Sequence, residues 1–589
     1  MSVNRSLILL LLALSISSLV LVPIGGSLAQ SGTSTAAAPT LIPPTKVPIA
    51  TEEPTTFTAS TQSGIVTLQQ EGIIRVGTLY NVPPFVWLDE AGQLSGYEAD
   101  IIRAIAEEIG VQVEFVQVTG ETYQQRLLSG EVDILIGEQI HTRQAEEFYE
   151  FSHTYYYNEQ RMVVREPDMS LYPDLTSLTD HRIAVVAGSR GEEALNVWMS
   201  HTGRNFQLVR FLSEDKALDA LANGEVDGTV GELDDLSRAG RVQMSLVPES
   251  VQLDPYAIAF RRYDVNLRNL INRSLQRLYV NGTLPSLGAK WFPGQLINYA
   301  AFIPLYGNLQ DDARTVADFP PDMPIPSSST IDKILAGQPL LVAGLDMVEG
   351  GFYYESFLDG VSEDIVNELA RRWGISVTIL PNTYSTAADL VANRQADMAM
   401  NVRARWDGAD RLDYTFPYHY TGDRIIVLEG SQWDSFDDFR RGQWIGYFQD
   451  SPEDKTYLES LGRTYSVYTF ADSEQAIAEL VTTRNVDALY GDSVRLLAFM
   501  ERYPYGWRFL PEGFGPDSFQ PIVIGLPRND ADFVSLVNWT LGEMYADGTL
   551  KQIWADNFDI GKWLIEYGID VPHWMPNFPG YGDFLYNRQ

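Results

Sequence analysis

The chain contains an internal repeat at a spacing of 260 to 268 residues, which constrains its fold more than any other feature. Five short motifs recur in the same order, and ordered motifs at a nearly constant spacing indicate a tandem duplication. The sequence therefore predicts two related units, at residues 65–294 and 331–558. The matching motifs are Ile74–Gly77 with Leu341–Gly344, Gly130–Asp133 with Arg394–Asp397, Gly224–Asp227 with Arg484–Asp487, Asn281–Leu284 with Asp547–Leu550, and Leu296–Tyr299 with Leu564–Tyr567.

Each unit is predicted to consist of two α/β lobes, because strand and helix patterns alternate and then restart after Tyr157. This alternation indicates layers of helices on a largely parallel sheet, and ligands of such folds bind in the cleft between lobes. In the first unit, strands are expected at 73–78, 111–116, 132–136, 183–186, 206–211 and 226–230. Lobe A is expected at 65–157 with 256–294 and at 331–420 with 520–558, and lobe B at 158–255 and 421–519.

The segments outside the two units differ from them in composition. Residues 1–29 have a basic start, an apolar run and small residues before position 30, which is typical of a signal peptide. An uncleaved membrane anchor is the alternative. Residues 30–64 are rich in Ser, Thr and Pro and predict an extended linker, and 295–330 a connector. The aromatic tail at 559–589 either packs on its own unit or binds a partner.

Composition excludes several classes of protein. The chain has 42 Lys plus Arg against 78 Asp plus Glu, a net charge of −36, which is the wrong field for nucleic acid. It contains no cysteine, which excludes disulfides, thiolate nucleophiles, Cys-type zinc sites and a lipoprotein anchor. The six histidines show no metal-ligand spacing, so no metal or cofactor is expected.

A series of short motifs occurs in a fixed order along the two units. They are Ile74–Thr78, Pro83-Pro84-Phe85, Gly96–Asp100, Gly110–Phe115, Glu150-Phe151-Ser152, Asn281–Leu284 with Trp291, and in the second unit Gly374–Val377, Asp413–Tyr418 and Val486–Ala488. Together these motifs resemble those of the family 3 extracellular solute-binding proteins, which are the polar amino-acid-binding components of ABC importers. The resemblance implies two tandem units of the type II periplasmic-binding fold, each with two α/β lobes around a ligand cleft.

The family's carboxylate-binding arginine lies three residues after a threonine, but here Ala145 follows Thr142 at that distance. An arginine suits this role because its planar guanidinium forms two parallel charge-assisted hydrogen bonds. Arg143 directly follows Thr142, so it is the candidate for the carboxylate-binding arginine of the first unit. In the second unit the stretch beginning at Asn401 offers Asn401 itself, Arg403 and Arg405. Surface salt bridges are the alternative for the three arginines.

The resemblance also implies an acidic residue that binds the ligand ammonium group. Asp492 is at that position in the second unit and Glu232 in the first, while Asp346 occupies a further acidic position of the family. Glu138 is another carboxylate expected in the first cleft. A helix-capping role at the end of a strand is the alternative for Asp492, Glu232 and Asp346.

Aromatic rings and one backbone turn complete the expected sites. Rings over a ligand's cationic part supply area and cation–π attraction, and the Gly188-Ser189-Arg190 turn presents backbone N–H groups to an anion. Core packing is the alternative for Phe85 and Phe352. The expected ring-bearing residues are Tyr80, Phe85 and Tyr123 in the first unit and Phe352, Tyr353 and Tyr384 in the second.

These features predict a secreted or surface-held protein that captures a small polar, amino-acid-like solute and is not an enzyme. Its expected location is extracytoplasmic, its expected partner an ABC transporter permease, and its only membrane contact the signal or anchor segment or that partner. One alternative is an extracellular sensory or partner-binding ectodomain with degenerate sites. Another is a cyclohexadienyl-dehydratase-like enzyme, which requires a general acid in the cleft, such as Glu138 or Glu232.

Overall fold

The fold was analysed in a computed structural model. The expected signal segment, the linker up to residue 59 and the aromatic tail lie outside the residues that the structure describes. Among the described helices, none is both long and apolar enough to cross a membrane. The described residues belong to one compact unit. They are residue 60 and residues 62–557, apart from 234–235, 237–242, 308, 310–311, 313, 324–327, 346–352, 383, 450–451, 462–463 and 511–519.

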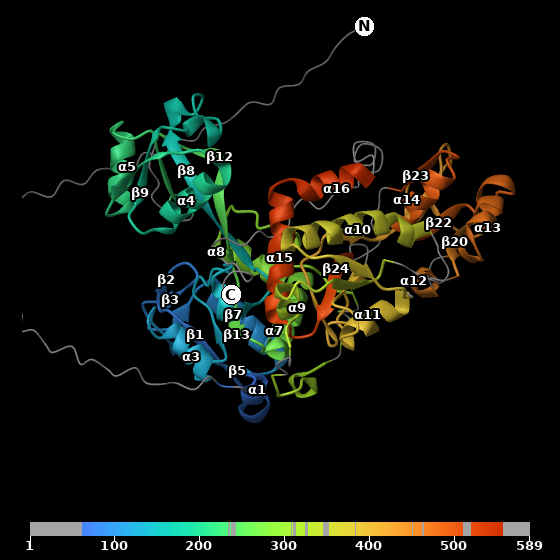
Figure 1. Cartoon of the computed structure of the whole chain (residues 1–589), viewed down its shortest axis with the longest axis horizontal. Coiled ribbons are helices and arrows are strands. Elements are labelled where there is room, and N and C mark those ends of the chain that lie inside the picture. Colours follow the sequence, from blue (N-terminus) through green and yellow to red (C-terminus); the bar gives the residue numbers. More distant parts are fainter. Residues whose placement is uncertain are drawn as a thin grey trace, which may run out of the picture. The chain divides into compact units, whose positions relative to one another are not determined.

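Sheet 1 forms the centre of the first lobe (Figure 1). β1 is parallel to β5 and β6, whereas β13 is antiparallel to β6 and β7, so the sheet is mixed and not largely parallel as the sequence predicted. Helices α2, α7 and α8 pack on one another beside it. The strand order is β5 (Gln112–Gln117), β1 (Ile73–Thr78), β6 (Ile134–Leu135), β13 (Ala259–Arg261) and β7 (Tyr149–Phe151), and the helices are α2 (Tyr97–Ile109), α7 (Val265–Val280) and α8 (Thr283–Trp291).

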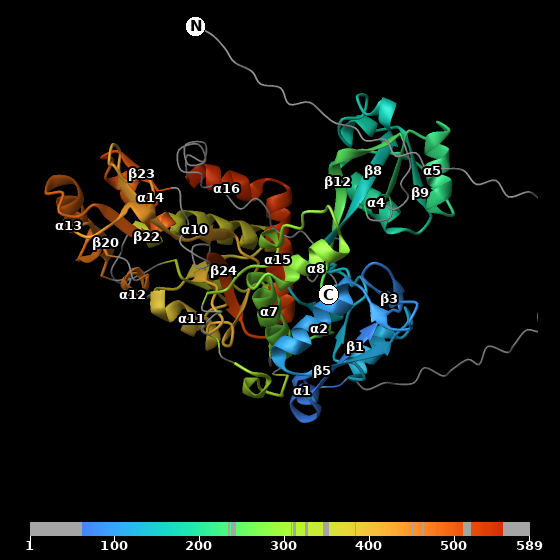
Figure 2. The same cartoon turned by 180° about the vertical axis from the view of Figure 1, so that it is seen from behind.

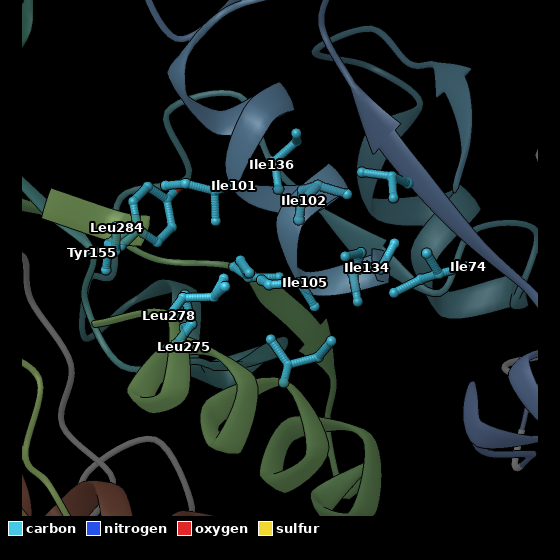
Figure 3. Packing of buried hydrophobic residues seen from close by; sticks show 14 of the residues in the cluster. Ile74, Ile101, Ile102, Ile105, Ile134, Ile136, Tyr155, Leu275, Leu278 and Leu284 are labelled. Carbon is cyan, nitrogen blue, oxygen red and sulfur yellow. The ribbon is translucent and has the colours of Figure 1, made fainter. Parts of the chain in front are cut away.

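The core of this lobe is built from apolar side chains at helical and strand spacing. Ile102 and Ile105 of α2 lie toward Ile134 and Ile74 of the sheet, and Ile101 lies beside Tyr155, as Figure 3 shows; these side chains are each at most 1% exposed. Side chains of the segment that the sequence predicted as a connector are buried in the same core. They are Tyr299, Phe302, Ile303, Val316 and Phe319.

Sheet 2 forms the second lobe of the first unit, with α4 and α5 packed on it. Two of its strands, β8 and β12, are long, antiparallel to each other and absent from the sequence prediction. They connect this sheet to sheet 1, because β8 begins five residues after β7 and β12 ends three residues before β13. The order is β10 (Gln207–Phe211), β9 (Arg182–Val186), β11 (Gly228–Glu232), β8 (Tyr156–Arg165) and β12 (Met244–Tyr256), with α4 (Arg190–Thr202) and α5 (Glu214–Ala222).

The second unit repeats this arrangement in sheets 3 and 4. In sheet 3 the order is β15 (Val377–Ile379), β14 (Leu340–Ala343), β16 (Met398–Arg403), β24 (Gln520–Pro527) and β17 (Leu412–Tyr414), with β18 (His419–Thr421) also paired to β24. In sheet 4 it is β21 (Ser466–Phe470), β20 (Trp444–Phe448), β22 (Ala488–Asp492), β19 (Asp423–Leu428) and β23 (Trp507–Phe509).

Helices α10 (Tyr353–Trp373), α15 (Ala531–Ala546) and α16 (Thr549–Asn557) pack on one another in the second unit, as Figure 2 shows. The remaining described elements are short. They are α1 (Ile65–Glu71), α3 (Tyr123–Ser129), α9 (Thr330–Leu335), α11 (Tyr384–Ala392), α12 (Pro452–Ser460), α13 (Ser473–Ile477), α14 (Ser493–Arg502) and the small sheet of β2 (Asn81–Val82), β3 (Val86–Leu88) and β4 (Leu94–Ser95).

Buried ion pairs join the two units. Arg268 of α7 lies between Glu150 of the first unit, at 2.5 Å, and Asp413 of the second, at 2.6 Å. Arg273, one turn further along α7, is 1% exposed at its side chain and lies 3.4 Å from Asp410. Burial of charge is tolerated only when the charges are paired in this way. Buried ion pairs therefore hold together the lobes that contain sheets 1 and 3.

Candidate ligand-binding sites

In the first unit, polar side chains from both lobes meet where β8, β11 and β12 come together. The Nδ2 atom of Asn158 donates to Glu232 Oε2 at 2.8 Å and to the Tyr256 hydroxyl at 3.0 Å. Burial, and then the charges of Glu138 and Glu232, raise the pKa of the Tyr256 hydroxyl well above its usual range. Glu138 follows β6 of sheet 1 and Glu232 ends β11 of sheet 2. The charges of two carboxylates, one from each lobe, therefore raise the pKa of one hydroxyl group. We call Glu138, Asn158, Glu232 and Tyr256 the acidic cluster.

A second group of polar side chains adjoins Asn158 on β8 and β12. Gln160 donates to Asp254 Oδ2 at 2.8 Å, and Asp254 also accepts from Arg190 at 2.5 Å and from Gln252 at 2.7 Å. Asn158 and Gln160 are 1% and 0% exposed, yet Asn158 Oδ1 and Gln160 Oε1 accept no hydrogen bond from the described residues. Because buried acceptors are normally satisfied, these two amide oxygens are exceptions among the described residues.

The Gly188-Ser189-Arg190 turn, which we predicted as an anion site, contacts carboxylates of the chain itself. The N–H of Gly188 donates to Glu192 Oε2 at 2.8 Å, and the Ser189 hydroxyl accepts from the N–H of Glu192 and caps α4. The Arg190 guanidinium lies between Asp254 and Glu193. Local carboxylates therefore occupy the groups that were expected to bind a ligand anion.

The other predicted residues of the first unit lie in different surroundings. Arg143 pairs with Glu543 of the second unit at 2.5 Å and stacks over Trp539, so its contacts are those of a salt bridge between units. Phe85 is 1% exposed and packs edge-on against Tyr256, which is the core alternative. The hydroxyl of Tyr80 donates to the carbonyl of Phe115, and the Tyr123 ring lies 6.3 Å from that of Tyr149.

In the second unit, two predicted residues contact each other across the lobes. Arg403, at the end of β16 in sheet 3, lies 3.4 Å from Asp492, at the end of β22 in sheet 4. Asp492 is 7% exposed at its side chain, and Arg403 is 26% exposed. Asp492 occupies the position that Glu232 has in the first unit. The acid that was predicted to bind a ligand ammonium group therefore faces a guanidinium of the chain itself.

The remaining predicted residues of the second unit do not join this pair. Asn401 of β16 is 7% exposed, has a φ of +59°, accepts from Tyr418 at 2.9 Å and donates to the carbonyl of Gly344, so it links β16 to the residue after β14 and the residue before β18. Arg405 pairs with the exposed Asp407 at 3.3 Å. Asp346 and Phe352 lie outside the described residues, and Tyr353 and Tyr384 begin α10 and α11 with side chains that are outside them too.

Sequence reasoning missed Asn158, Gln160 and Tyr256. The available signal was the position of Asn158 and Gln160 two residues apart, between Tyr156 and Met162, which puts both amides on one face of an extended strand. Within the described part of the chain, no group of three or more His, Asp or Glu side chains is arranged to hold a metal ion.

Glu98, in the first turn of α2, supports the turn that carries Glu138. Its carboxylate accepts hydrogen bonds from the N–H of Gly137 at 2.8 Å and of Glu138 at 3.1 Å, and from the hydroxyl of Tyr155. Burial raises the pKa of Glu98 to about 7, although these hydrogen bonds lower it. The Glu98 carboxyl group is therefore protonated on folding at mildly acidic pH.

We expect Glu98→Gln to change the pH dependence of stability. Because the folded pKa of about 7 exceeds the unfolded value of 4.5, the stabilising protonation of Glu98 is complete below pH 4.5 and lost as the pH rises to 7. The free energy of unfolding of the wild type should therefore fall relative to the variant by on the order of 3 kcal/mol over this range. Urea titrations at pH 4.5, 6 and 7.5 measure it, with the exposed Glu107→Gln as control. Parallel curves for the wild type and Glu98→Gln would contradict the assignment.

Comparison with known proteins identifies relatives of each unit. The sequence profile of the bacterial extracellular solute-binding proteins, family 3, matches residues 74–294 and 350–559. The amino-acid-binding protein AabA of Dichelobacter nodosus is 27% identical over 223 residues, which are 36% of this chain and 85% of that protein. The L-arginine-binding protein of Pseudomonas aeruginosa is 24% identical over 229 residues, 37% of this chain and 87% of that protein.

Among solved structures, an ancestral amino acid-binding protein, described as a precursor of cyclohexadienyl dehydratase, is 26% identical with a TM-score of 0.32. The match covers 39% of this chain and 99% of that one.

Proposed function

Because the chain belongs to the bacterial extracellular solute-binding proteins, family 3, as two tandem units of the type II periplasmic-binding fold, we propose that its first unit captures a small cationic solute. We further propose that it works outside the cytoplasm and delivers this solute to an ABC importer. The observation that carries the proposal is the acidic cluster, in which Glu138 and Glu232 from the two lobes act on Tyr256. Closure of the lobes over a cation would be stabilised by contacts to both carboxylates at once.

The net charge of −36 and the name of one relative, an L-arginine-binding protein, support a cationic solute. In the second unit, the position of Glu232 is taken by Asp492, which pairs with Arg403. We propose that this internal guanidinium takes the place of a bound cation there. The first unit is then the solute-binding unit of the protein.

Calorimetric titration of the full chain tests this function. We expect cationic solutes such as arginine, lysine and their amines to bind and to raise the melting temperature, whereas glutamate does not. At a concentration 100 times the Kd, binding adds about 2.7 kcal/mol to the free energy of unfolding. Glu131→Gln removes an acidic side chain that is 54% exposed and serves as a charge-matched control that keeps binding.

Two results would contradict the proposal. The first is the absence of binding by every cationic solute at millimolar concentration. The second is turnover of a cyclohexadienyl acid such as arogenate, which would make the first cleft the active site of an enzyme.

A further inference from the structure

A cavity of about 100 Å³ lies between the two units. It is lined by β7 and α7 of the first unit and by the corresponding β17 and α15 of the second. Neither the acidic cluster nor the Arg403–Asp492 pair lines it. Because each unit supplies only part of the walls, the cavity requires both units and differs from the cleft within either of them.

We propose that this cavity binds a small uncharged carboxamide of about four non-hydrogen atoms. The proposal goes beyond the proposed function, which concerns a cation in the cleft of the first unit, and it does not depend on that function. It follows from two asparagines at matching positions of the repeat, from the size of the cavity and from the charges of its walls.

Asn272 of α7 and Asn538 of α15 line the cavity and make the same contact in their own units. Oδ1 of Asn272 accepts from the N–H of His153 at 2.8 Å, and Oδ1 of Asn538 accepts from the N–H of Phe416 at 2.9 Å. A backbone N–H only donates, so these contacts fix which end of each amide is the oxygen.

The nitrogen ends of these two amides are donors in need of an acceptor. Asn272 and Asn538 are 6% and 7% exposed, and within the described part of the chain their Nδ2 atoms donate to no acceptor. Buried donors are normally satisfied, by water or by a ligand where the protein supplies no acceptor. The carbonyl oxygen of a carboxamide is a suitable partner, since it has two lone pairs.

The size and the apolar part of the walls favour a small molecule over water alone. An engineered cavity of about 150 Å³ holds benzene, so 100 Å³ suits about four non-hydrogen atoms. Apolar walls with a few polar groups are typical of small-molecule sites, and they suit a carboxamide with a short apolar end. The apolar and aromatic side chains of the walls include Tyr306, Leu412, Tyr414, Phe416 and Val534.

The charges of the walls disfavour an anion. Three acids, one arginine and two histidines line the cavity, and burial lowers the pKa of His153 to about 3, so this histidine is neutral at pH 7. Even with a proton on the other histidine, the acids are in excess, and an anionic ligand would meet like charge. The acids are Glu146, Glu150 and Asp413, and the other basic residues are Arg268 and His141.

A cation is disfavoured because the acceptors of the walls already bind the chain. Glu150 and Asp413 each accept from Arg268 with one carboxylate oxygen and from a backbone N–H with the other. Oε1 of Glu146 contacts His141, and its Oε2 is enclosed by the protein. The N–H groups of a cation would therefore face the two asparagine donors.

Three ligands of the same shape and different charge test the inference, namely acetamide, acetate and acetamidinium. Each is titrated into the full chain at pH 7, and the broadening of the ligand's methyl NMR signal is followed. We expect acetamide to bind with a Kd on the order of 1 to 10 mM, as suits so small a ligand. It should bind at least about 10-fold more tightly than either charged ligand. Glu232→Gln, which disables the cleft of the first unit, should leave the acetamide affinity unchanged.

Variants locate the site. Asn272→Asp and Asn538→Asp keep an oxygen for the backbone N–H but replace the amide donor with an acceptor. Each should weaken acetamide binding at least about 10-fold and reverse the preference toward acetamidinium, which a purely structural role would not do. Ser535→Leu narrows the cavity from α15 and should weaken all three ligands. The exposed Asn223→Asp is the matched control and should change nothing.

Four results would overturn the inference. They are acetate or acetamidinium binding as tightly as acetamide in the wild type, no acetamide binding at about 100 mM, an unchanged acetamide affinity in both asparagine variants, and loss of acetamide binding in Glu232→Gln. The last result would assign the ligand to the first cleft and leave the proposed function in place. Conversely, acetamide binding in a chain that binds no cationic solute would contradict the proposed function alone.

Discussion

Replacement of Arg268 with methionine is expected to lower the free energy of unfolding by about 3 to 5 kcal/mol, the cost of breaking a buried ion pair from one side. The guanidinium of Arg268 contacts Glu150 at 2.5 Å and Asp413 at 2.6 Å, and the side chains of these acids are 9% and 2% exposed. Without the arginine, two carboxylates face each other in the interior. The loss is measured by urea denaturation of the full chain, followed by both fluorescence and circular dichroism.

The pH dependence gives this prediction a second readout. Burial already raises the pKa of Glu150, and Arg268 is the largest of the influences that lower it. In Arg268→Met the pKa of Glu150 should rise further, so the stability deficit should shrink as the pH falls and the carboxyl group becomes neutral. Arg411→Met is the control, because Arg411 pairs with Asp389 at the surface with half of each side chain exposed. A change of less than about 0.5 kcal/mol in both variants would contradict the assigned role.

Removal of Arg403 is expected to create a cation site in the second unit. The test uses Arg403→Met in a chain whose first cleft is disabled by Glu232→Gln, so that any amine binding belongs to the second unit. Asp492, 7% exposed, then loses its contact with the Arg403 guanidinium, and a ligand ammonium group can replace that guanidinium. We expect agmatine affinity at least about 10-fold above that of Glu232→Gln alone, with one site per chain.

The matched control for this experiment is Arg405→Met, two residues further along. Arg405 is 51% exposed and pairs with Asp407 outside the cleft, so its removal should not restore binding. Calorimetric titration measures the affinity and the number of sites. Equal agmatine heats in the Arg403→Met and Arg405→Met chains would show that the Arg403–Asp492 pair does not occupy a cation site.

Local sequence patterns were enough to predict the elements whose apolar residues recur at the usual spacing. Strand β1 has the predicted bounds, because its apolar residues recur at strand spacing. The patterns failed for β8, where Asn158 and Gln160 are buried polar residues in a strand, so the usual alternation of apolar and polar residues is missing. The long antiparallel strands between the sheets were missed for this reason.

The site was only partly predictable, since its chemistry depends on pairing between distant residues. Glu138 and Glu232 were selected from the sequence and both act on Tyr256. Arg143 was selected too, but its partner Glu543 is 400 residues away and no local pattern indicates it. Arg403 and Asp492 were both selected as groups that bind opposite ends of a ligand, whereas folding brings them to each other.

The ion pairs of α7 limit how the duplicated chain can lose one of its units during evolution. Arg268 and Arg273 each have acidic partners in the other unit, at Asp413 and Asp410. Deletion of either copy would leave buried charge without its counterion in the copy that stays. A unit that lost solute binding would therefore still be needed as the structural counterpart of the other unit.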